Sequence, residues 1–450
     1  MKILLEDTCR RAIHYLDGLN DRKVGPESIS GLDRLRADLP EDPADARDVI
    51  AELDNVVSPA TMAMAGPRFF GLVIGGSMPA ALAANWLAGA WDQNSSIHDL
   101  TPGTARLEEL ALSWLINIFK LPPKCGGAFV TGDTLANFSA LAAARHAVLA
   151  RAGWNVESEG LIGAPEIRVV VGAEAHVSIF KSLGMLGLGR NRVIKVPVDE
   201  QGRMRADSLP TLSSNTIVCT QAGNVNTGAF DPTGEICLRA HEAGAWVHVD
   251  GAFGLWASAA PSRAYLAKGV EQADSWATDA HKWLNVPYDS GLAFVRDGEA
   301  LRSAMAVSAE YLPIGMVHRN PSDYTPELSR RARGVEVWAA LRSLGRSGLA
   351  DLIERTCRYA RRFAQGLSEA GYEVLNEVVL NQVLVSFGDA DTTKNIIAEL
   401  QADGTCWCGG TVWQGHTAMR ISVSSWATTE ADVDRSLEAM LRIASKHARR

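Results

Sequence analysis

The sequence lacks the features that mark several classes of protein. Nowhere do about 18 strongly apolar residues run together, and acidic residues interrupt the apolar patch near the N-terminus, so neither a membrane-spanning helix nor a secretory leader is predicted. There is no long basic run, and the formal net charge is −8, which argues against a nucleic-acid partner. The 7 cysteines show no CxxC spacing of a zinc site and are odd in number, which does not suit a disulfide framework. We therefore expect a cytoplasmic protein with free thiols.

The composition and the order of predicted elements are typical of a globular α/β protein. Of the 450 residues, 47% are hydrophobic and 21% charged, which is enough to bury a substantial core. From about residue 125, helical stretches separate short β-branched runs at 128–130, 168–171, 193–196, 216–219, 246–249 and 292–295. This alternation predicts a mainly parallel sheet covered on both faces. In such sheets ligands bind beyond the carboxyl ends of the strands, so residues just after each strand are the candidates for function.

The two ends of the chain differ from this central part. The first sixty or so residues alternate amphipathic helical pieces with polar, proline-containing turns, as in an arm without a core of its own. After residue 300, Thr325-Pro326-Glu327 predicts the start of a helix that continues through the apolar spacing of Val335 to Leu344. Strands are predicted at 373–376, 383–387 and 419–423, and a capped helix after Thr428-Thr429-Glu430. These elements predict a smaller α+β domain.

A lysine and an acid near predicted strand ends are candidates for chemistry. Lys282 lies between Trp276 and Trp283 in the sequence, and partial burial there would lower the pKa of its amine and make it a nucleophile toward an aldehyde. Asp250 ends an apolar strand and could pair with a buried cationic ring nitrogen. Each has a plainer alternative, because a lone lysine is most often a solvated surface residue and an acid after a strand often caps a helix or forms an Asx turn.

Two further segments that follow predicted strands are also candidates for binding a ligand. The turn from Thr131 to Asn137 leads from a strand into a helix, whose free N–H groups and positive dipole end suit a phosphate. It has no Walker lysine and no complete GxGxxG pattern, which argues against a nucleotide. His176 also follows a strand, although a histidine there is often only structural. One ligand would use all four features, because pyridoxal phosphate has a phosphate, a pyridine nitrogen, an aldehyde and a ring face.

On these residues the sequence resembles the pyridoxal-phosphate-dependent group II amino acid decarboxylases, which have the aspartate-aminotransferase-like fold (PLP-dependent transferase type I). The resemblance runs from about Pro67 onward through Gly66-Pro67-Arg68-Phe69-Phe70, Thr101-Pro102 with Leu107-Glu108, the Thr131 to Asn137 turn, His248-Val249-Asp250-Gly251-Ala252, His281-Lys282-Trp283 and Ser329-Arg330-Arg331. It implies an N-terminal helical dimerisation arm (1–60), a large PLP-binding domain (61–325), a small C-terminal domain (326–450) and a homodimer.

The resemblance also implies roles for residues around the cofactor. Lys282 would condense with the aldehyde, Asp250 would keep the pyridine nitrogen protonated, and Ala252 and His176 would lie against the two ring faces. Asp133 and Thr134 stand at the phosphate-cradle positions, and His281 would reach the phosphate. The family often has small residues at position 133, so there we expect the backbone N–H to donate, with the carboxylate turned away. Asn224 stands where many relatives carry Thr and would donate a hydrogen bond to the cofactor.

Further roles follow from the resemblance for the substrate. Tyr311, 29 positions after Lys282, is similar to the loop tyrosine that returns a proton to Cα in aromatic decarboxylases, with Tyr324 as the second candidate. Arg420 is similar to the residue that binds the substrate carboxylate in glutamate decarboxylases, and a guanidinium fork suits that task. Its alternative is a structural ion pair. Phe70, with Phe69 and Trp91, would line the side-chain pocket, although these residues also suit a hydrophobic core.

The leading prediction is decarboxylation of an L-amino acid to the corresponding amine, with pyridoxal 5'-phosphate as cofactor and without a metal. The alternatives are an aminotransferase, a decarboxylation-dependent aldehyde synthase, and a cofactor-binding protein without turnover. His176 and the His281-Lys282 pair favour decarboxylation, because aminotransferases of this fold more often stack a Tyr, Phe or Trp on the ring. The sequence leaves open which amino acid is the substrate.

Overall fold

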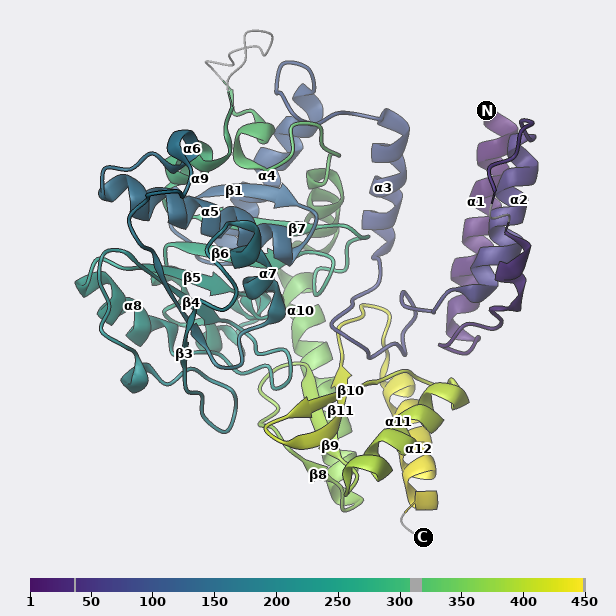
Figure 1. The fold of residues 1–450 in the computed structure, drawn as a ribbon. Helices are drawn as coiled ribbons and strands as arrows, with labels where there is room; N and C mark the ends of the chain where they lie inside the picture. Colours follow the sequence, from purple (N-terminus) through teal and green to yellow (C-terminus); the bar gives the residue numbers. More distant parts are fainter. Residues whose placement is uncertain (36–37, 308–317, 448–450) are drawn as a thin grey trace. The chain divides into compact units, whose positions relative to one another are not determined.

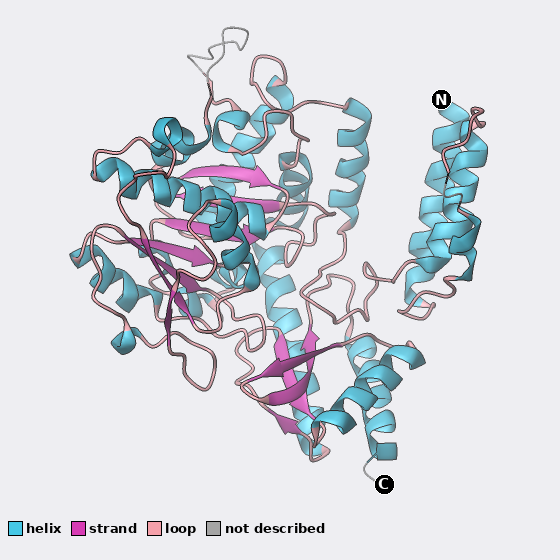
Figure 2. Cartoon of the chain, viewed as in Figure 1, coloured by secondary structure: helices cyan, strands magenta, loops and turns pink. Residues whose placement is uncertain are grey.

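The computed structural model of the protein describes residues 1–35, 38–307 and 318–447 (Figure 1). The chain forms two compact units. The sheet unit comprises Ser77–Ala360 and Asn376–Gln382, and the terminal unit comprises Met1–Gly76, Arg361–Leu375 and Val383–Arg450. Figure 2 shows that both units combine helices with a sheet. Among the described helices, none has the length and apolar character needed to cross a bilayer.

The sheet unit is built on seven strands in the order β1-β7-β6-β5-β4-β2-β3. The strands are β1 Gly126–Val130, β2 Arg168–Gly172, β3 Ile194–Val196, β4 Thr216–Gln221, β5 Trp246–Asp250, β6 Ser275–Asp279 and β7 Gly291–Val295. Only β7 runs against its neighbours, and the remaining pairs are parallel. The predicted α/β fold class with a mainly parallel sheet is therefore confirmed. Strand β6 was not predicted.

This topology brings the ends of several strands to one edge. Since β1 and β6 both run antiparallel to β7, they point in the same direction as each other and as β5, β4 and β2. The segments that leave β1, β2, β5 and β6 at their carboxyl ends therefore all start at the same edge of the sheet. This is the edge at which open α/β sheets bind ligands.

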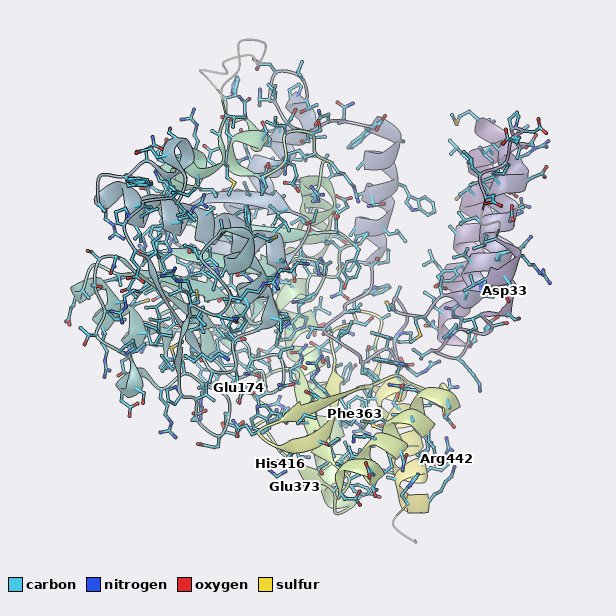
Figure 3. The ribbon with its side chains drawn as sticks, viewed as in Figure 1. Asp33, Glu174, Phe363, Glu373, His416 and Arg442 are labelled. Carbon is cyan, nitrogen blue, oxygen red and sulfur yellow. The ribbon has the colours of Figure 1, made fainter. Side chains whose placement is uncertain are left out.

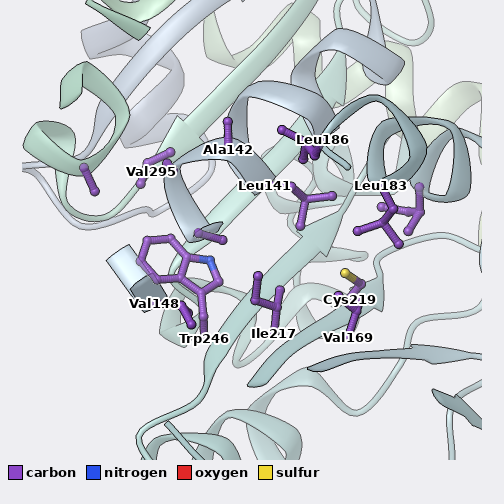
Figure 4. Close-up of a cluster of buried hydrophobic side chains, with 14 of the residues drawn as sticks. Leu141, Ala142, Val148, Val169, Leu183, Leu186, Ile217, Cys219, Trp246 and Val295 are labelled. Atoms are coloured by element: carbon purple, nitrogen blue, oxygen red, sulfur yellow. The ribbon is translucent and has the colours of Figure 1, made fainter. Parts of the chain in front are cut away.

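Helices surround the sheet of this unit. They are α3 Pro79–Trp91, α4 Pro102–Ile118, α5 Asp133–Arg151, α6 Val156–Glu159, α7 Val177–Met185, α8 Thr233–Glu242, α9 Gly298–Met305 and α10 Gly334–Glu369, whose last turns belong to the terminal unit. Helix α5 packs on β5, β6 and β7. Leu141 of α5 belongs to the same buried apolar cluster as Val169, Ile217 and Val295 of the strands (Figure 4). Such burial fixes where α5 begins relative to the sheet.

The segment before α10 corrects one prediction. A helix was expected to begin at Thr325, but α10 begins at Gly334, and Thr325 is extended, with φ −128° and ψ 154°. The reason is a set of hydrogen bonds to residues that are distant in the sequence. The backbone N–H of Arg330 donates to Asn94 (2.9 Å), and its buried guanidinium donates to Glu108 (2.7 Å) and to the Phe129 carbonyl (2.9 Å). These bonds hold the segment out of a helix.

The terminal unit has two helices from the N-terminal region, α1 Lys2–Asp17 and α2 Ala46–Val57, and an antiparallel sheet in the order β10-β11-β9-β8. The strands are β8 Glu373–Val374, β9 Gln382–Ser386, β10 Gly409–Trp413 and β11 His416–Ser422, and the remaining helices are α11 Ala390–Asp403 and α12 Glu430–His447. Thr429 Oγ1 accepts from the backbone N–H of Asp432 (3.3 Å), so the predicted capped helix is confirmed. Strand β10 was not predicted.

Candidate active site

The central contact of the site is an ion pair between Lys282 and Asp279. Asp279 ends β6, Lys282 lies in the turn that follows, and Lys282 Nζ lies 3.0 Å from Asp279 Oδ2. The side chains are 19% and 2% exposed. Burial by itself lowers the pKa of Lys282, but the negative charges of Asp279, Asp133 and Asp250 outweigh burial and raise it. The predicted lowering of the amine pKa is therefore wrong for this arrangement, because the sequence did not show that three acids surround the amine.

Two of these acids lie together under a shared set of donors. The amide nitrogen of Asn137 lies 2.9 Å from Asp133 Oδ2 and 3.3 Å from Asp250 Oδ2, and the hydroxyl of Ser178 lies 3.0 Å and 3.4 Å from the same two oxygens. Burial and a neighbouring carboxylate raise the pKa of Asp133 to about 6 and that of Asp250 to about 7. The two carboxyl groups therefore hold protons more readily than exposed acids.

His176 lies beside this pair. Its ring, Asp133 and Asp250 each offer one atom within 4.8 Å of the others. His176 caps α7, because its Nδ1 accepts from the backbone N–H of Ser178 at 3.3 Å, and the same nitrogen lies 2.8 Å from the Ser178 hydroxyl. The three side chains are close enough to share a cation, yet the amide of Asn137 already donates to both carboxylates, and the single hydroxyl proton of Ser178 can be directed at either of them.

A buried histidine orients the side chain of Asn137 through a hydrogen bond. His248 of β5 has one ring nitrogen 2.7 Å from Asn137 Oδ1 and the other 2.9 Å from Ser275 Oγ. Because an amide oxygen only accepts, Nε2 of His248 carries the proton. Burial lowers the pKa of His248 to about 3, so the ring is neutral. This contact turns the NH₂ group of Asn137 toward Asp133 and Asp250.

The other predicted cofactor residues lie at the same edge. The backbone N–H of Ala252 donates to Asp250 Oδ1 (3.2 Å), and Thr134 is in the first turn of α5. The ring of His281 stacks on Tyr288 with centroids 4.2 Å apart, and burial together with Lys282 lowers the pKa of His281 to about 3. Asn224 follows β4 at this edge, where its amide nitrogen lies 3.3 Å from Glu174, a residue labelled in Figure 3, and its oxygen accepts from the backbone of Asn226.

The predicted substrate residues are not brought to this cluster by any described contact. Tyr311 lies outside the described residues. Tyr324 packs under the guanidinium of Arg319, 4.2 Å from the ring centroid. Phe70 and Arg420 belong to the terminal unit, where Phe70 is buried against Phe363 with ring centroids 5.1 Å apart. Burial lowers the pKa of Arg420 within that unit. The roles of these residues stay predictions.

Four residues of the site were not singled out from the sequence: Asn137, Ser178, His248 and Asp279. Spacing offered a signal for two of them. Asp279 precedes Lys282 by three positions, and Asn137 follows Asp133 by four positions on one helix, where side chains meet. Ser178 and His248 had no such signal, because their partners are distant in the sequence.

The donor set suits pyridoxal phosphate in three respects and conflicts with it in one. Lys282 offers an amine for an aldehyde, Asp250 a carboxylate for a ring nitrogen, and α5 an N-terminus for a phosphate. The conflict is between negative charges, because a phosphate is expected where two buried carboxylates lie. Asp133 and Asp279 each have a buried Oδ1 without a hydrogen-bond partner among the described residues. A phosphate near both carboxylates requires that at least one of them carry a proton.

Comparisons with known proteins find relatives along most of the chain. A family profile described as "Pyridoxal-dependent decarboxylase conserved domain" matches residues 29–388. An aromatic-L-amino-acid decarboxylase of Bacillus atrophaeus is 24% identical over 443 residues, which cover 93% of this chain and 90% of the relative. An L-2,4-diaminobutyrate decarboxylase of Rhizobium meliloti is 30% identical over 384 residues, covering 80% and 74%. The crystal structure of Oryza sativa TDC with PLP and tryptamine superposes with a TM-score of 0.91 at 24% identity, covering 99% of this chain and 98% of the other.

Proposed function

The chain belongs to the pyridoxal-dependent decarboxylase family and is a carboxy-lyase that uses pyridoxal 5'-phosphate, and we propose that it converts an L-amino acid to the corresponding amine and carbon dioxide. The observation that carries this proposal is the buried cluster of Lys282 with Asp279, Asp250 and Asp133 at the carboxyl edge of the sheet. The cluster places an amine that can condense with an aldehyde near an acid that can face a ring nitrogen.

The cofactor, when bound, supplies an aldehyde that condenses with amines and a ring that takes up the electron pair left by carbon dioxide. Lys282 is proposed to hold the aldehyde carbon and then to yield it to the amino group of the substrate. Asp250 is proposed to keep the ring nitrogen protonated. Burial and Asp133 raise the pKa of Asp250 to about 7, so Asp250 gains from a cationic partner at this place.

Residues around these two are proposed to orient the cofactor. His176, beside Asp250, is proposed to lie on one ring face, and Ala252, whose N–H donates to Asp250, on the other. The first turn of α5, with Asp133 and Thr134, is proposed to receive the phosphate together with His281. Asn224 is proposed as a further hydrogen-bond donor, because its amide nitrogen has a second N–H besides the one directed at Glu174.

The substrate is proposed to use residues that match the family motif. Arg420 would bind its carboxylate through the guanidinium fork, and Phe70 would contact its side chain. Tyr311 would return a proton to Cα after carbon dioxide leaves. Conservative replacement separates binding from chemistry, because loss of Arg420 should raise KM, whereas loss of Tyr311 should lower kcat.

We also propose that the protein acts as a homodimer in the cytoplasm. Helix α1 has no buried residue, and its apolar side chains Ile3, Leu5 and Ile13 are 70%, 57% and 49% exposed. A second copy of the chain would cover such side chains. All seven cysteines lie in the described residues and none forms a disulfide there, which suits a reducing compartment. Analytical ultracentrifugation of the full chain and of a chain lacking residues 1–60 tests the role of this segment in dimer formation.

The proposed reaction is tested by a panel of L-amino acids that includes aromatic, acidic and diamino members. The holoenzyme is incubated with each, and carbon dioxide, amine, aldehyde and keto acid are measured. The proposal predicts equal amounts of carbon dioxide and amine from at least one class. Keto acid without carbon dioxide would indicate an aminotransferase, and carbon dioxide with aldehyde would indicate an aldehyde synthase. The Lys282→Ala variant is the control and should form none of these products.

A further inference from the structure

A cleft of about 1510 Å³ lies at the edge of the sheet opposite the candidate active site. Its lining includes residues 125–127, where β1 begins, and residues 296–299, which follow β7. Because β7 runs antiparallel to β1, these segments lie at one edge, whereas Lys282, Asp250 and Asp133 lie at the carboxyl ends of strands at the other edge. Sites for small molecules usually have roughly 300–1,000 Å³, so the cleft is large enough for one.

Two helices begin at the wall of this cleft. Helix α10 is interrupted at Gly345, whose φ of 60° and ψ of −174° are not helical, and Arg346 and Ser347 of the resumed helix line the cleft. Helix α9 begins at Gly298, beside the start of β1, where a Cβ on Gly126 would lie only 2.6 Å from the Gly298 Cα. The N-terminus of a helix carries a partial positive charge, which favours an anion nearby.

Four basic side chains line the cleft without an acidic partner among the described residues: Lys120, Lys124, Arg296 and Arg346. The two lysines are exposed. Arg296 donates to two backbone carbonyls, at 3.0 Å and 2.7 Å, and Arg346 donates to the side-chain oxygen of Asn117 at 2.5 Å. These oxygens are neutral, so within the described part of the chain no ion pair neutralises the four positive charges.

The acidic side chains of the cleft already have partners of their own. Glu109 pairs with Arg106 at 3.0 Å, and Glu299 lies 3.6 Å from Arg302. Asp297 caps α9, where it accepts from a backbone N–H at 3.1 Å. Five lining residues are basic and three are acidic, although the whole chain has a net charge of −8. A positive cleft on an acidic protein raises the local concentration of small anions.

The uncharged part of the lining is mainly aliphatic. Leu112, Leu121 and Leu349 are 6%, 4% and 1% exposed, and Ile116 lines the cleft with them. Tyr324, the aromatic ring in the lining, already packs under a guanidinium. Aromatic ligands gain from stacking on free rings, whereas an aliphatic chain needs only apolar contact, so this wall fits an aliphatic body.

We propose that this cleft binds a small amphipathic anion, with an aliphatic body and a carboxylate or phosphate head. The body lies over the leucines of the wall, and the head lies among Lys120, Lys124 and Arg346. The inference goes beyond the proposed function and does not rest on it, because the cofactor is proposed to bind at the other edge of the sheet.

The binding test is isothermal titration calorimetry of the cofactor-saturated whole chain with octanoate, decanoate, decyl phosphate and decanol, each below its micelle concentration. A buried methylene tightens binding by up to about fourfold, so decanoate should bind about tenfold more tightly than octanoate. Decanol should bind more weakly than decanoate. Comparison of decanoate with decyl phosphate assigns the preferred head. No binding of either anion, equal affinity for octanoate and decanoate, or equal affinity for decanol and decanoate would overturn the inference.

A double variant locates the bound anion in the cleft. Lys120→Gln with Lys124→Gln should weaken decanoate binding about fivefold, since exposed charge pairs contribute little each, and should leave decanol binding unchanged. The matched control is Lys181→Gln with Lys268→Gln, which removes two exposed lysines of the same unit outside the cleft and should bind decanoate as the wild type does. Equal dissociation constants for the two double variants would place the anion elsewhere and overturn the inference, whatever the outcome for the proposed function.

Discussion

His248 Nε2 lies 2.7 Å from the side-chain oxygen of Asn137, and this contact links the centre of the sheet to the acids of the site. The amide nitrogen of Asn137 donates in turn to Asp133 and Asp250. All four residues are buried, so each hydrogen bond that is lost would leave a polar group without water. The site is therefore held by a hydrogen-bonded network inside the sheet unit.

This network makes the stability of the protein depend on pH. Burial lowers the pKa of His248 from 6.5 to about 3, so below pH 6.5 the unfolded chain binds a proton that the folded protein does not. Above pH 6.5 this group does not reduce the free energy of unfolding. As the pH falls from 6.5 toward 3 the free energy of unfolding decreases, and at pH 5 the loss is about 2 kcal/mol. His248→Gln should flatten the fall in unfolding free energy between about pH 7.5 and 5 by that amount. Urea denaturation measures it.

The control for this prediction is His416→Gln on the exposed end of the β10–β11 hairpin, a residue labelled in Figure 3. It should leave the pH slope of the wild type unchanged. A slope for His248→Gln equal to that of the wild type would show that His248 is not held neutral in the folded protein.

Replacing Asp250 should separate cofactor binding from catalysis. In Asp250→Asn the charge that would face the ring nitrogen is gone, while Asn137 and Ser178 can still hydrogen-bond to residue 250. Breaking a buried charge pair costs about 3–5 kcal/mol, or roughly 10²–10⁴ in rate if the whole cost falls on the transition state. We expect a holoenzyme with a bound-cofactor absorption band and carbon dioxide release reduced by about that factor.

Asp297→Asn, at the exposed N-cap of α9, is the matched control and should keep full activity, since Asn also caps helices well. Wild-type activity in Asp250→Asn would remove Asp250 from the proposed mechanism.

Tyr311→Phe tests the proposed proton donor. Loss of a general acid typically costs about 10²–10⁴ in rate, so amine formation should fall by that factor while cofactor absorption is retained. Diversion of product to aldehyde would have the same cause, a failure to protonate Cα. Tyr324→Phe is the companion variant, because Tyr324 is packed under Arg319 and should tolerate the change. Undiminished amine formation by Tyr311→Phe would assign the proton to another residue.

The stability of the sheet unit should depend on Glu108. Its carboxylate lies 2.7 Å from Arg330 and 3.0 Å from Arg319, and Glu108 and Arg330 are 1% and 0% exposed. Glu108→Gln leaves a buried guanidinium without its anion, which costs about 3–5 kcal/mol, and the melting temperature should drop by several degrees. The neighbouring Glu109→Gln removes only an exposed pair with Arg106 and should cost less than about 1 kcal/mol. Equal melting temperatures for the two variants would contradict this account.

The fold could be predicted where burial follows simple sequence patterns. Strands such as β4 and β5 read as β-branched runs because their side chains are buried on both faces. Strand β6 was missed because Ser275, Thr278 and Asp279 do not look like a buried strand. Their polar groups find partners only in the folded protein, at His248, Ala252 and Lys282. The helix start at Thr325 failed for a similar reason, since distant partners of Arg330 override the local signal.

The residues of the site could be predicted where they are adjacent to strand ends, but the contacts between them could not. Lys282, Asp250 and the α5 junction are adjacent to strand ends, so the sequence alone indicates that they share an edge. The charge of Lys282 could not be predicted, because it depends on three carboxylates that come from separate strands and a helix. The partners of His248 are likewise distant in the sequence.

The central claim is that Lys282 carries the cofactor, and one measurement tests it most directly. Holoenzyme is treated with borohydride, which reduces a C=N bond to a stable secondary amine, and its peptides are then examined by mass spectrometry. The account predicts the mass of the reduced cofactor on the peptide that contains Lys282, on the lysine nitrogen, and its absence in Lys282→Ala. A label on another lysine, or no label on a cofactor-saturated protein, would contradict the account.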